Sequence, residues 1–190
     1  LDIILSLAAT IILAIPMGLV ALWIKLDSPG PVFFKQRRVG KGKTHFNILK
    51  FRTMRGDTPH DVPTHLLKDA DSYITGSGAF LRKTSLDELP QIYNILKGDM
   101  SIVGPRPERP ELAAELEKEI PEFSFRLQVK AGLTGYAQVY GKYNTTPYDK
   151  LKLDLTYIRN YSVLEDLKLI IMTPKIMLMK ESTEGVKEEQ

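Results

Sequence analysis

The residues best suited to chemistry are two adjacent carboxylates, Asp87 and Glu88, in the segment LRKTSLDELPQ. Three cationic side chains stand near them in the sequence or across a short loop, namely Arg82, Lys83 and Arg106. Carboxylates among Lys and Arg suit a site that handles phosphate, because a hard cation such as Mg²⁺ can bring the anions together. A helix that begins here would add a phosphate-binding N-terminus. The pattern therefore indicates metal-assisted phosphoryl chemistry.

The same residues also fit a purely structural interpretation. Ser85 and Glu88 have the spacing of a capping box, in which Ser85 begins a helix and Glu88 bonds back to it. Asp87 would then lie in the first helical turn, where the helix dipole stabilises any acid. Spacing alone favours this capping interpretation. Pro90 argues for a special site, because it removes the amide that would bond the carbonyl of Leu86.

Longer motifs decide between the two interpretations. They are the apolar start of the chain, DSPGPVFFKQRRVG (27–40), KFRTM (50–54), LRKTSLDELPQ (81–91), GDMSIVGPRP (98–107) and GLTGYAQV (132–139). With these motifs in this order, residues 2–180 resemble the bacterial sugar transferases. These are monotopic phosphoglycosyl transferases that begin glycan assembly on undecaprenyl phosphate.

This resemblance implies an enzyme that transfers a sugar-1-phosphate from a UDP-sugar to a polyprenyl phosphate, such as undecaprenyl phosphate, and releases UMP. It implies that Asp87 is the nucleophile, which forms a covalent phosphosugar intermediate, and that Glu88 helps to bind Mg²⁺. A carboxylate nucleophile is reasonable because it divides one difficult displacement into two. The reaction would be the first membrane step of a bacterial capsule, O-antigen, exopolysaccharide or glycoprotein pathway. The sequence identifies neither the sugar nor the glycan.

Five basic residues are predicted to bind substrate, because cationic side chains, and arginine above all, bind phosphate oxygens. They are Lys50, Arg52, Arg82, Arg106 and Lys142. For Lys50 and Arg52, a solvated or headgroup-facing surface is an equally good interpretation. Lys142 stands where the family commonly has Arg, and Tyr136 where it commonly has Trp. Both departures fit a subgroup with its own sugar donor.

Residues 1–24 are expected to bring this site to a membrane. They carry one charge, Asp2, and as an α-helix they would be roughly 36 Å long, enough to cross a bilayer core. Pro16 predicts a kink, so the segment either crosses the bilayer or bends and returns to the same face. Helix physics favours the crossing. The resemblance instead implies a proline-broken re-entrant membrane helix, although Ile15 stands where the family commonly has Ser.

The charge distribution supports a membrane location. The 190-residue chain has a net charge of only +3, but residues 25–55 contain nine Lys or Arg residues and one acid, Asp27. An apolar segment followed by a basic one is typical of insertion beside an anionic surface. We therefore predict the bacterial inner membrane, with the catalytic head on the cytoplasmic face. Because the chain begins at Leu1, we expect it to be part of a longer or processed protein.

The predicted fold class is α+β and mainly helical, with a small catalytic head that contains short strands. The predicted domains are the membrane helix 1–24, a cytoplasmic catalytic domain 25–180 and an acidic tail 181–190. Strands are expected at 32–34 and 46–49 around a turn at 40–42, followed by a loop at 56–75. Segment 76–104 is predicted to be helical in two pieces, and 131–141 to be a turn and strand. Further helices are expected at 111–120, 147–161 and 162–180.

The helices within 147–180 are predicted to be amphipathic and to lie at the membrane interface. Tyr157 and Tyr161 would then lie at headgroup depth, and Asp154 and Glu165 would face water. A second possibility is that their apolar faces belong to the protein core.

Other functions are less well supported. The chain has no cysteine, which excludes disulfides, thiolate metal sites and cysteine nucleophiles. Nucleic-acid binding is disfavoured, because the basic segment follows an apolar anchor and lacks aromatics arranged for base stacking. A membrane-anchored lipid- or nucleotide-binding scaffold without turnover would be expected to lack Asp87, Glu88 or Arg106, and all three are present. The expected partners are a UDP-sugar, polyprenyl phosphate and membrane lipids, and a homo-oligomer is compatible with the sequence.

Overall fold

The computed structural model describes residues 1–59, 69–142 and 144–177. This part is mostly helical and contains two two-stranded sheets, which confirms the predicted mainly helical α+β class. The helices are α1 (Asp2–Asp27), α2 (Gly76–Thr84), α3 (Gln91–Lys97), α4 (Pro110–Glu119), α5 (Tyr136–Tyr140), α6 (Pro147–Arg159) and α7 (Val163–Met177). The strands are β1 (Phe33–Val39), β2 (His45–Phe51), β3 (Met100–Val103) and β4 (Ala131–Thr134). The 3₁₀-helices are η1 (Lys41–Lys43), η3 (Ala70–Tyr73), η4 (Leu86–Glu88) and η5 (Pro121–Gln128). Part of the predicted loop (60–68) and the predicted acidic tail lie outside the described residues.

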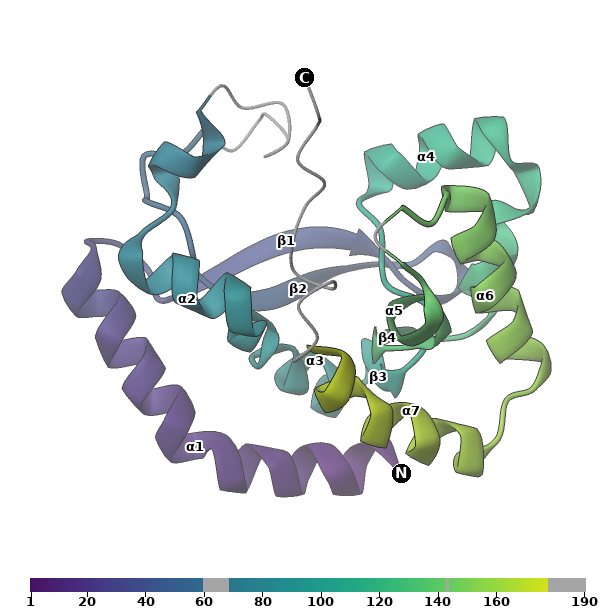
Figure 1. Cartoon of the computed structure of the whole chain (residues 1–190), viewed down its shortest axis with the longest axis horizontal. Helices are drawn as coiled ribbons and strands as arrows, with labels where there is room; N and C mark the ends of the chain where they lie inside the picture. Colours follow the sequence, from purple (N-terminus) through teal and green to yellow (C-terminus); the bar gives the residue numbers. More distant parts are fainter. Residues whose placement is uncertain (60–68, 143, 178–190) are drawn as a thin grey trace.

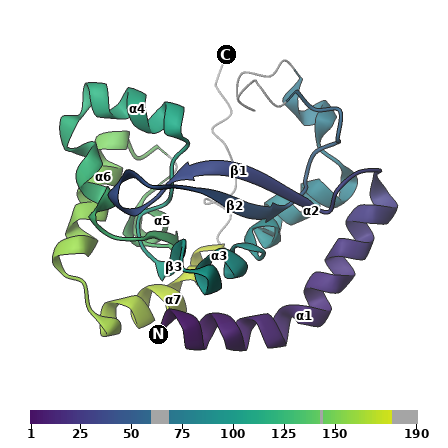
Figure 2. The same cartoon turned by 180° about the vertical axis from the view of Figure 1, so that it is seen from behind.

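Helix α1 lies along the outside of the molecule (Figures 1 and 2). It remains helical through Pro16, and its axis bends in both views. Among the described residues it is the one helix long and apolar enough to cross a membrane, by length and composition. It buries only Ser6, Met17 and Ile24, and its exposed side chains include Ile4, Ile11, Ile12, Ile15 and Leu26.

Both ends of α1 are attached to the same folded body. At its start, the Asp2 carboxylate accepts a hydrogen bond from the backbone N–H of Ile102 in β3 (3.2 Å). At its end, the Asp27 carboxylate accepts from the backbone N–H and the hydroxyl of Ser77 in α2 (2.9 and 2.7 Å). Between them, Met17 and Ile24 pack in one hydrophobic cluster with Phe51 and Leu81. The helix is therefore part of the folded body rather than an appendage to it.

Strands β1 and β2 form an antiparallel hairpin that runs across the middle of the molecule (Figure 1). The hairpin and its turn at 40–42 were predicted, and each strand extends beyond the predicted residues. Helix α3 docks against β2 through Asn94, whose side-chain oxygen accepts from the N–H of Leu49 (2.9 Å). The Asn94 amide also donates to the carbonyl of Asn47 (2.8 Å). This contact places the start of α3 beside the end of β2.

The second sheet pairs β3 with β4 in parallel. The prediction that 76–104 is helical to its end was therefore wrong for β3, and the predicted strand at 131–141 stops at Thr134, before α5. Close backbone approach explains the pairing, since a Cβ on Gly132 would lie 2.1 Å from the nitrogen of Gly104. The N–H of Gly104 donates to the carbonyl of Thr134 (2.8 Å). Two glycines far apart in sequence thus position the loop that follows β3.

Helices α6 and α7 match the predicted helices, but α6 is oriented differently. Asp154 and Tyr157 are each 1% exposed, so the predictions that they face water and headgroups were wrong. Tyr157 packs with Val103, Val139 and Leu169 in an internal cluster, and its hydroxyl donates to Asp166 (2.8 Å). The apolar face of α6 therefore covers the second sheet. Helix α7 keeps an exposed apolar face that includes Val163, Leu164, Leu167 and Ile171.

Candidate active site

The two carboxylates lie on a single 3₁₀ turn between α2 and α3. The chain leaves α2 at Ser85, which has a left-handed backbone (φ 55°) and makes no side-chain cap, so the predicted capping box was wrong. Pro90 had led us to expect that the Leu86 carbonyl would be free. It instead accepts a hydrogen bond from the N–H of Leu89 (3.2 Å). Leu86 and Leu89 pack against the cluster on α1. The dyad is thus held by its two flanking leucines.

Glu88 is engaged by two cations from separate elements. Lys50, near the end of β2, donates to its Oε1 at 2.7 Å. Arg106, in the loop after β3, binds both carboxylate oxygens, with Nη1 3.2 Å from Oε2. Burial raises the pKa of Glu88, but the charges and hydrogen bonds of Arg106 and Lys50 outweigh it and lower the pKa to about 2. Glu88 is therefore ionised at any physiological pH.

Asp87 is the less constrained member of the pair. Its nearest cation is Lys50, with Nζ 3.9 Å from Oδ2, and no described residue donates a hydrogen bond to its carboxylate. Burial raises its pKa, and the Lys50 charge opposes that effect. A half-buried carboxylate without hydrogen bonds keeps its lone pairs available to a substrate. This arrangement suits a nucleophile, whereas the binding of Glu88 suits a charge-balancing role.

Asp87 faces a cleft of about 420 Å³, within the usual size range of ligand pockets. The hairpin contributes Phe33, Phe34, Gln36 and Lys50 to its lining, and α2 contributes Arg82. Arg82 is oriented by a hydrogen bond from its Nε to the Thr53 hydroxyl (2.9 Å). Helix α2 approaches the segment after β2 so closely that a Cβ on Gly78 would lie 2.0 Å from the Thr53 carbonyl oxygen.

The predicted substrate-binding residues divide into two groups. The structure gathers Lys50, Arg82 and Arg106 around the dyad. Arg52 lines the cleft, but its guanidinium is buried and donates to the carbonyls at 29 (2.6 Å) and 28 (2.8 Å). This contact holds the chain where it leaves α1. Lys142 is exposed in the loop after α5 and is not among the described residues that line the cleft.

Most cations of the basic segment 25–55 bind other groups of the protein. Six of its nine cations have protein partners, and one example is Lys43, which pairs with Glu117 (2.8 Å). The alternative of a purely headgroup-facing surface therefore does not describe Lys50 or Arg52. Lys35, Arg37 and Lys41 make no hydrogen bond or ion pair through their side chains with the described residues and remain available to anions in solution or at a membrane.

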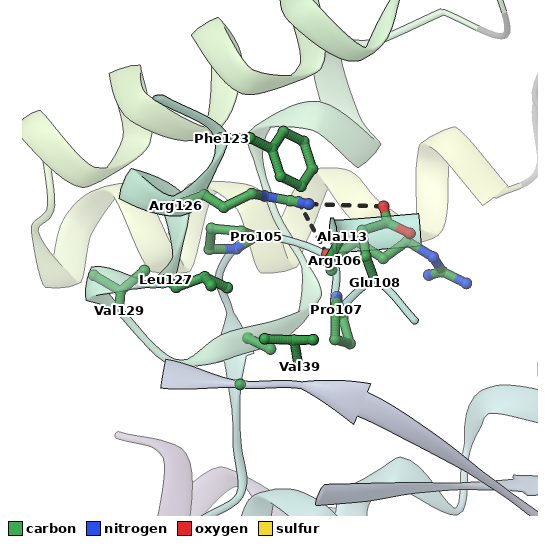
Figure 3. A pocket seen from close by; sticks show the side chains of 12 residues that line it. Val39, Pro105, Arg106, Pro107, Glu108, Ala113, Phe123, Arg126, Leu127 and Val129 are labelled. Carbon is green, nitrogen blue, oxygen red and sulfur yellow. Dashed lines mark hydrogen bonds and ion pairs between the residues drawn. The ribbon is translucent and has the colours of Figure 1, made fainter. Parts of the chain in front are cut away.

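A buried ion cluster behind Arg106 was missed by the sequence analysis. Figure 3 shows Arg126 beneath the Phe123 ring, with contacts to Glu108 and to the backbone of Arg106. Its Nη2 donates to the Arg106 carbonyl (2.9 Å) and lies 2.7 Å from Asp154. The adjoining cavity, about 10 Å³, has room for little more than a water molecule. No spacing signal joins Arg126 to Asp154, because only the docking of α6 brings them together.

The residues that could hold a magnesium ion are the two carboxylates of the dyad. A carboxylate offers about four acceptor positions, and Glu88 uses three of them, leaving one on Oε2. The Asp87 oxygens accept no hydrogen bond from the described residues. Mg²⁺ commonly binds one or two carboxylates and takes its other ligands from water and substrate phosphate. No group of three or more histidine, cysteine or acidic side chains converges anywhere among the described residues, so these two carboxylates are the protein ligands that the site offers.

A sequence model of the bacterial sugar transferases matches residues 1–180. The chain belongs to the bacterial sugar transferase family. It is 45% identical over 159 residues to a UDP-glucose:undecaprenyl-phosphate glucose-1-phosphate transferase of Xanthomonas campestris pv. campestris, a match that covers 81% of this chain and 33% of the relative. A Caulobacter vibrioides protein of the same name is 41% identical over 185 residues, which cover 94% of this chain and 68% of the relative.

A third family member, the exopolysaccharide production protein PSS of Rhizobium leguminosarum bv. phaseoli, has nearly the same length as this chain. It is 41% identical over 180 residues, which cover 90% of each protein. The Xanthomonas relative is about three times as long as the matched segment. Family membership thus rests on nearly the whole of the present chain, including the dyad and the segments 98–107 and 132–139.

Proposed function

We propose that this protein transfers a sugar-1-phosphate from a UDP-sugar to a polyprenyl phosphate such as undecaprenyl phosphate and releases UMP. The observation that carries the proposal is Asp87, a carboxylate that accepts no hydrogen bond from the described residues and faces a cleft lined with cations. The names of the Xanthomonas and Caulobacter relatives support the same reaction with glucose as the sugar. A panel of UDP-sugars distinguishes which sugar this chain transfers.

In the first step, an oxygen of Asp87 attacks the phosphorus that carries the sugar. The bond from this phosphorus to the bridging oxygen breaks, and UMP leaves with the electron pair. The product is an acyl phosphate that joins Asp87 to the sugar phosphate. Arg82 and Lys50 are placed to neutralise charge on the reacting phosphoryl group, which is the main task of protein groups in phosphoryl transfer.

In the second step, a phosphate oxygen of the polyprenyl phosphate attacks the same phosphorus. The bond to Asp87 breaks, and its carboxylate is regenerated. Glu88 stays ionised throughout, because Arg106 and Lys50 hold its pKa near 2. With Asp87 it would hold Mg²⁺, which when bound supplies positive charge to the substrate phosphates. Neither step requires a separate general base, since both attacking groups are anions.

The acceptor is a lipid, so the cleft must lie close to a membrane surface. The exposed apolar face of α1 and that of α7 support membrane association. We propose a re-entrant α1 in the bacterial inner membrane, with the catalytic body on the cytoplasmic side. This places the cleft at the depth of the lipid phosphate.

The decisive test is intact-mass spectrometry after incubation with a panel of UDP-sugars and no acceptor. We expect a sugar-phosphate adduct that maps to Asp87 with the correct donor, together with UMP release. Asp87→Asn should lower UMP release by on the order of a thousandfold or more and abolish the adduct. Asp149→Asn, which changes an exposed acid on α6, is the matched control and should behave as the wild type.

Three outcomes would each contradict part of the proposal. Full UMP release by Asp87→Asn would eliminate the nucleophile assignment. Binding of UDP-sugar and lipid phosphate by the wild type without any turnover would instead support a scaffold. Activity that persists after treatment with a chelator would eliminate the metal.

A further inference from the structure

The cleft contains more positive charge than its acid can balance. Five of the described residues that line it are cationic, and one, Asp87, is acidic. Three of the cations are already engaged, since Lys50 binds Glu88, Arg55 binds Asp57 and Arg52 binds backbone carbonyls. The remaining two are Arg82 and Arg109. Uncompensated guanidinium groups in a concave site favour an anionic ligand.

Arg109 is the less occupied of these two arginines. Arg82 donates one hydrogen bond to Thr53, whereas the Arg109 guanidinium has no hydrogen bond or ion pair with any described residue. Arg106, three residues earlier, has both terminal nitrogens on Glu88. Arg109 therefore has the guanidinium with the largest unused hydrogen-bonding capacity in the cleft.

The backbone of Arg109 is fixed at the start of α4, and other arginines lie near its side chain. It immediately precedes α4, and its carbonyl accepts the N–H of Ala113 (2.9 Å) in the first turn of that helix. Behind it, Arg38 donates to the Pro107 carbonyl (3.2 Å) and to Gln36 (2.6 Å). Burial lowers the pKa of Arg38 most, the Glu108 charge opposes this effect, and the charges of Arg106 and Arg109 lower the pKa further. Arg109 therefore belongs to a group of neighbouring guanidiniums whose repulsion Glu108 offsets only in part.

Arg82 and Arg109 come from opposite ends of the hairpin. Arg82 lies on α2 and Arg109 at the start of α4, and these helices lie towards different ends of β1 and β2 (Figure 1). The cations that act most strongly on Asp87 are Lys50, Arg106 and Arg82. Arg109 lines the same cleft as Asp87 but is not one of these cations, so its charge is available to a part of the ligand other than the phosphate that reacts at Asp87.

We propose that Arg109 binds the nucleoside-side phosphate of the donor, the phosphate that leaves in UMP. The assignment rests on the proposed function and gives the cleft a direction, with the sugar phosphate at Asp87 and the nucleoside towards α4. Arg109 would then hold the leaving group in line with the attacking carboxylate. The acceptor's lipid phosphate uses the Asp87 end and does not need Arg109.

The test is binding of UMP and of uridine to the full chain in detergent micelles, measured by calorimetry. Arg109→Gln should weaken UMP binding about ten- to hundredfold, because a charge-assisted contact is lost, and leave uridine binding unchanged. Arg109→Lys should recover part of the loss. Arg159→Gln removes the same charge from an exposed position at the end of α6 and should change neither ligand.

Kinetics provide an independent arm. Arg109→Gln should raise KM for the UDP-sugar by a similar factor and leave KM for polyprenyl phosphate unchanged. Unchanged UMP binding, equal weakening of UMP and uridine, or a change confined to the lipid acceptor would each overturn the assignment. A wild-type protein that binds UMP but never releases it from a UDP-sugar would refute the proposed function and leave the UMP site standing.

Discussion

Neighbouring carboxylates in the dyad have opposite electrostatic surroundings. Glu88 has three hydrogen bonds from Lys50 and Arg106 and a lowered pKa, whereas Asp87 has none from the described residues and a raised pKa. Ionising groups whose environments separate their pKa values commonly have separate chemical roles. In this site the separation supports the proposed roles, which are charge balance for Glu88 and reactivity for Asp87.

Formation of the adduct should therefore depend on the ionisation of Asp87. Because its pKa is raised above 3.8, the protonated form persists to a higher pH than in an exposed aspartate, and only the carboxylate attacks. We expect the single-turnover rate of adduct formation at saturating donor to rise with pH, with a midpoint above 3.8. Lys50→Met removes the nearest opposing cation and should move this midpoint upward.

Quenched intact-mass measurements across the acidic range supply both midpoints. Asp149→Asn is again the control and should reproduce the wild-type profile. A wild-type midpoint at or below 3.8, or a downward shift in Lys50→Met, would contradict the electrostatic assignment of Asp87.

Residue types and motifs predicted the dyad and the cations around it, but not the residues that surround and position them. The dyad, Lys50, Arg82 and Arg106 were predicted and lie together. Arg109 was missed, although a second arginine in PRPERP was a visible signal. The Arg126–Asp154 pair carried no such signal, because its partners are 28 positions apart and meet only through α6.

Among the elements, the segment that follows α1 connects this apolar helix to the cleft. Arg52, two residues after Lys50 on the same chain segment, donates to the carbonyls of Pro29 and Ser28. Asp27 bonds to the start of α2, the helix that ends at the dyad. The segment connecting α1 to β1 is thus tied to both walls of the cleft.

Loss of the Arg52 guanidinium should therefore reduce stability rather than donor affinity. Arg52→Met leaves two carbonyls without donors, and we expect the free energy of unfolding to fall by about 2–4 kcal/mol. Thermal melting in detergent measures this loss, with Arg159→Met as the control. The donor KM of the folded fraction should stay within about twofold of the wild type. If Arg52→Met melted at the wild-type temperature but had a raised donor KM, Arg52 would bind substrate, as the sequence predicted.

Local signals predicted the elements that local interactions determine. Pro147 begins α6 and glycines flank the hairpin turn, as the sequence indicated, and the structure adds Thr146 as the N-cap of α6. Strand β3 was assigned to a helix because its four residues are too few to display alternation, and its partner β4 lies about 30 residues away. Ser85 fitted a local capping pattern, but the packing of Leu86 and Leu89 against α1 fixes a left-handed turn instead.

For the whole molecule, the attachment of both ends of α1 limits how the protein can meet a membrane. Asp2 bonds to β3 and Asp27 to α2, while most of the apolar side chains between them are exposed. A helix that crossed the bilayer would carry Asp2 to the opposite surface and break its bond to Ile102. Insertion of the bent helix into one leaflet keeps both attachments and buries the same apolar surface.

Cysteine labelling in sealed, inverted membrane vesicles tests this topology, because the chain contains no cysteine of its own. We expect Leu1→Cys and Lys41→Cys, which report on the start of α1 and on the hairpin, to react with a membrane-impermeant maleimide from the same side. Ile12→Cys, at an exposed apolar position within α1, should stay protected until detergent is added. If Leu1→Cys reacts only after permeabilisation while Lys41→Cys reacts before it, then α1 crosses the membrane. The hydrogen bond between Asp2 and Ile102 would not then exist in the bilayer.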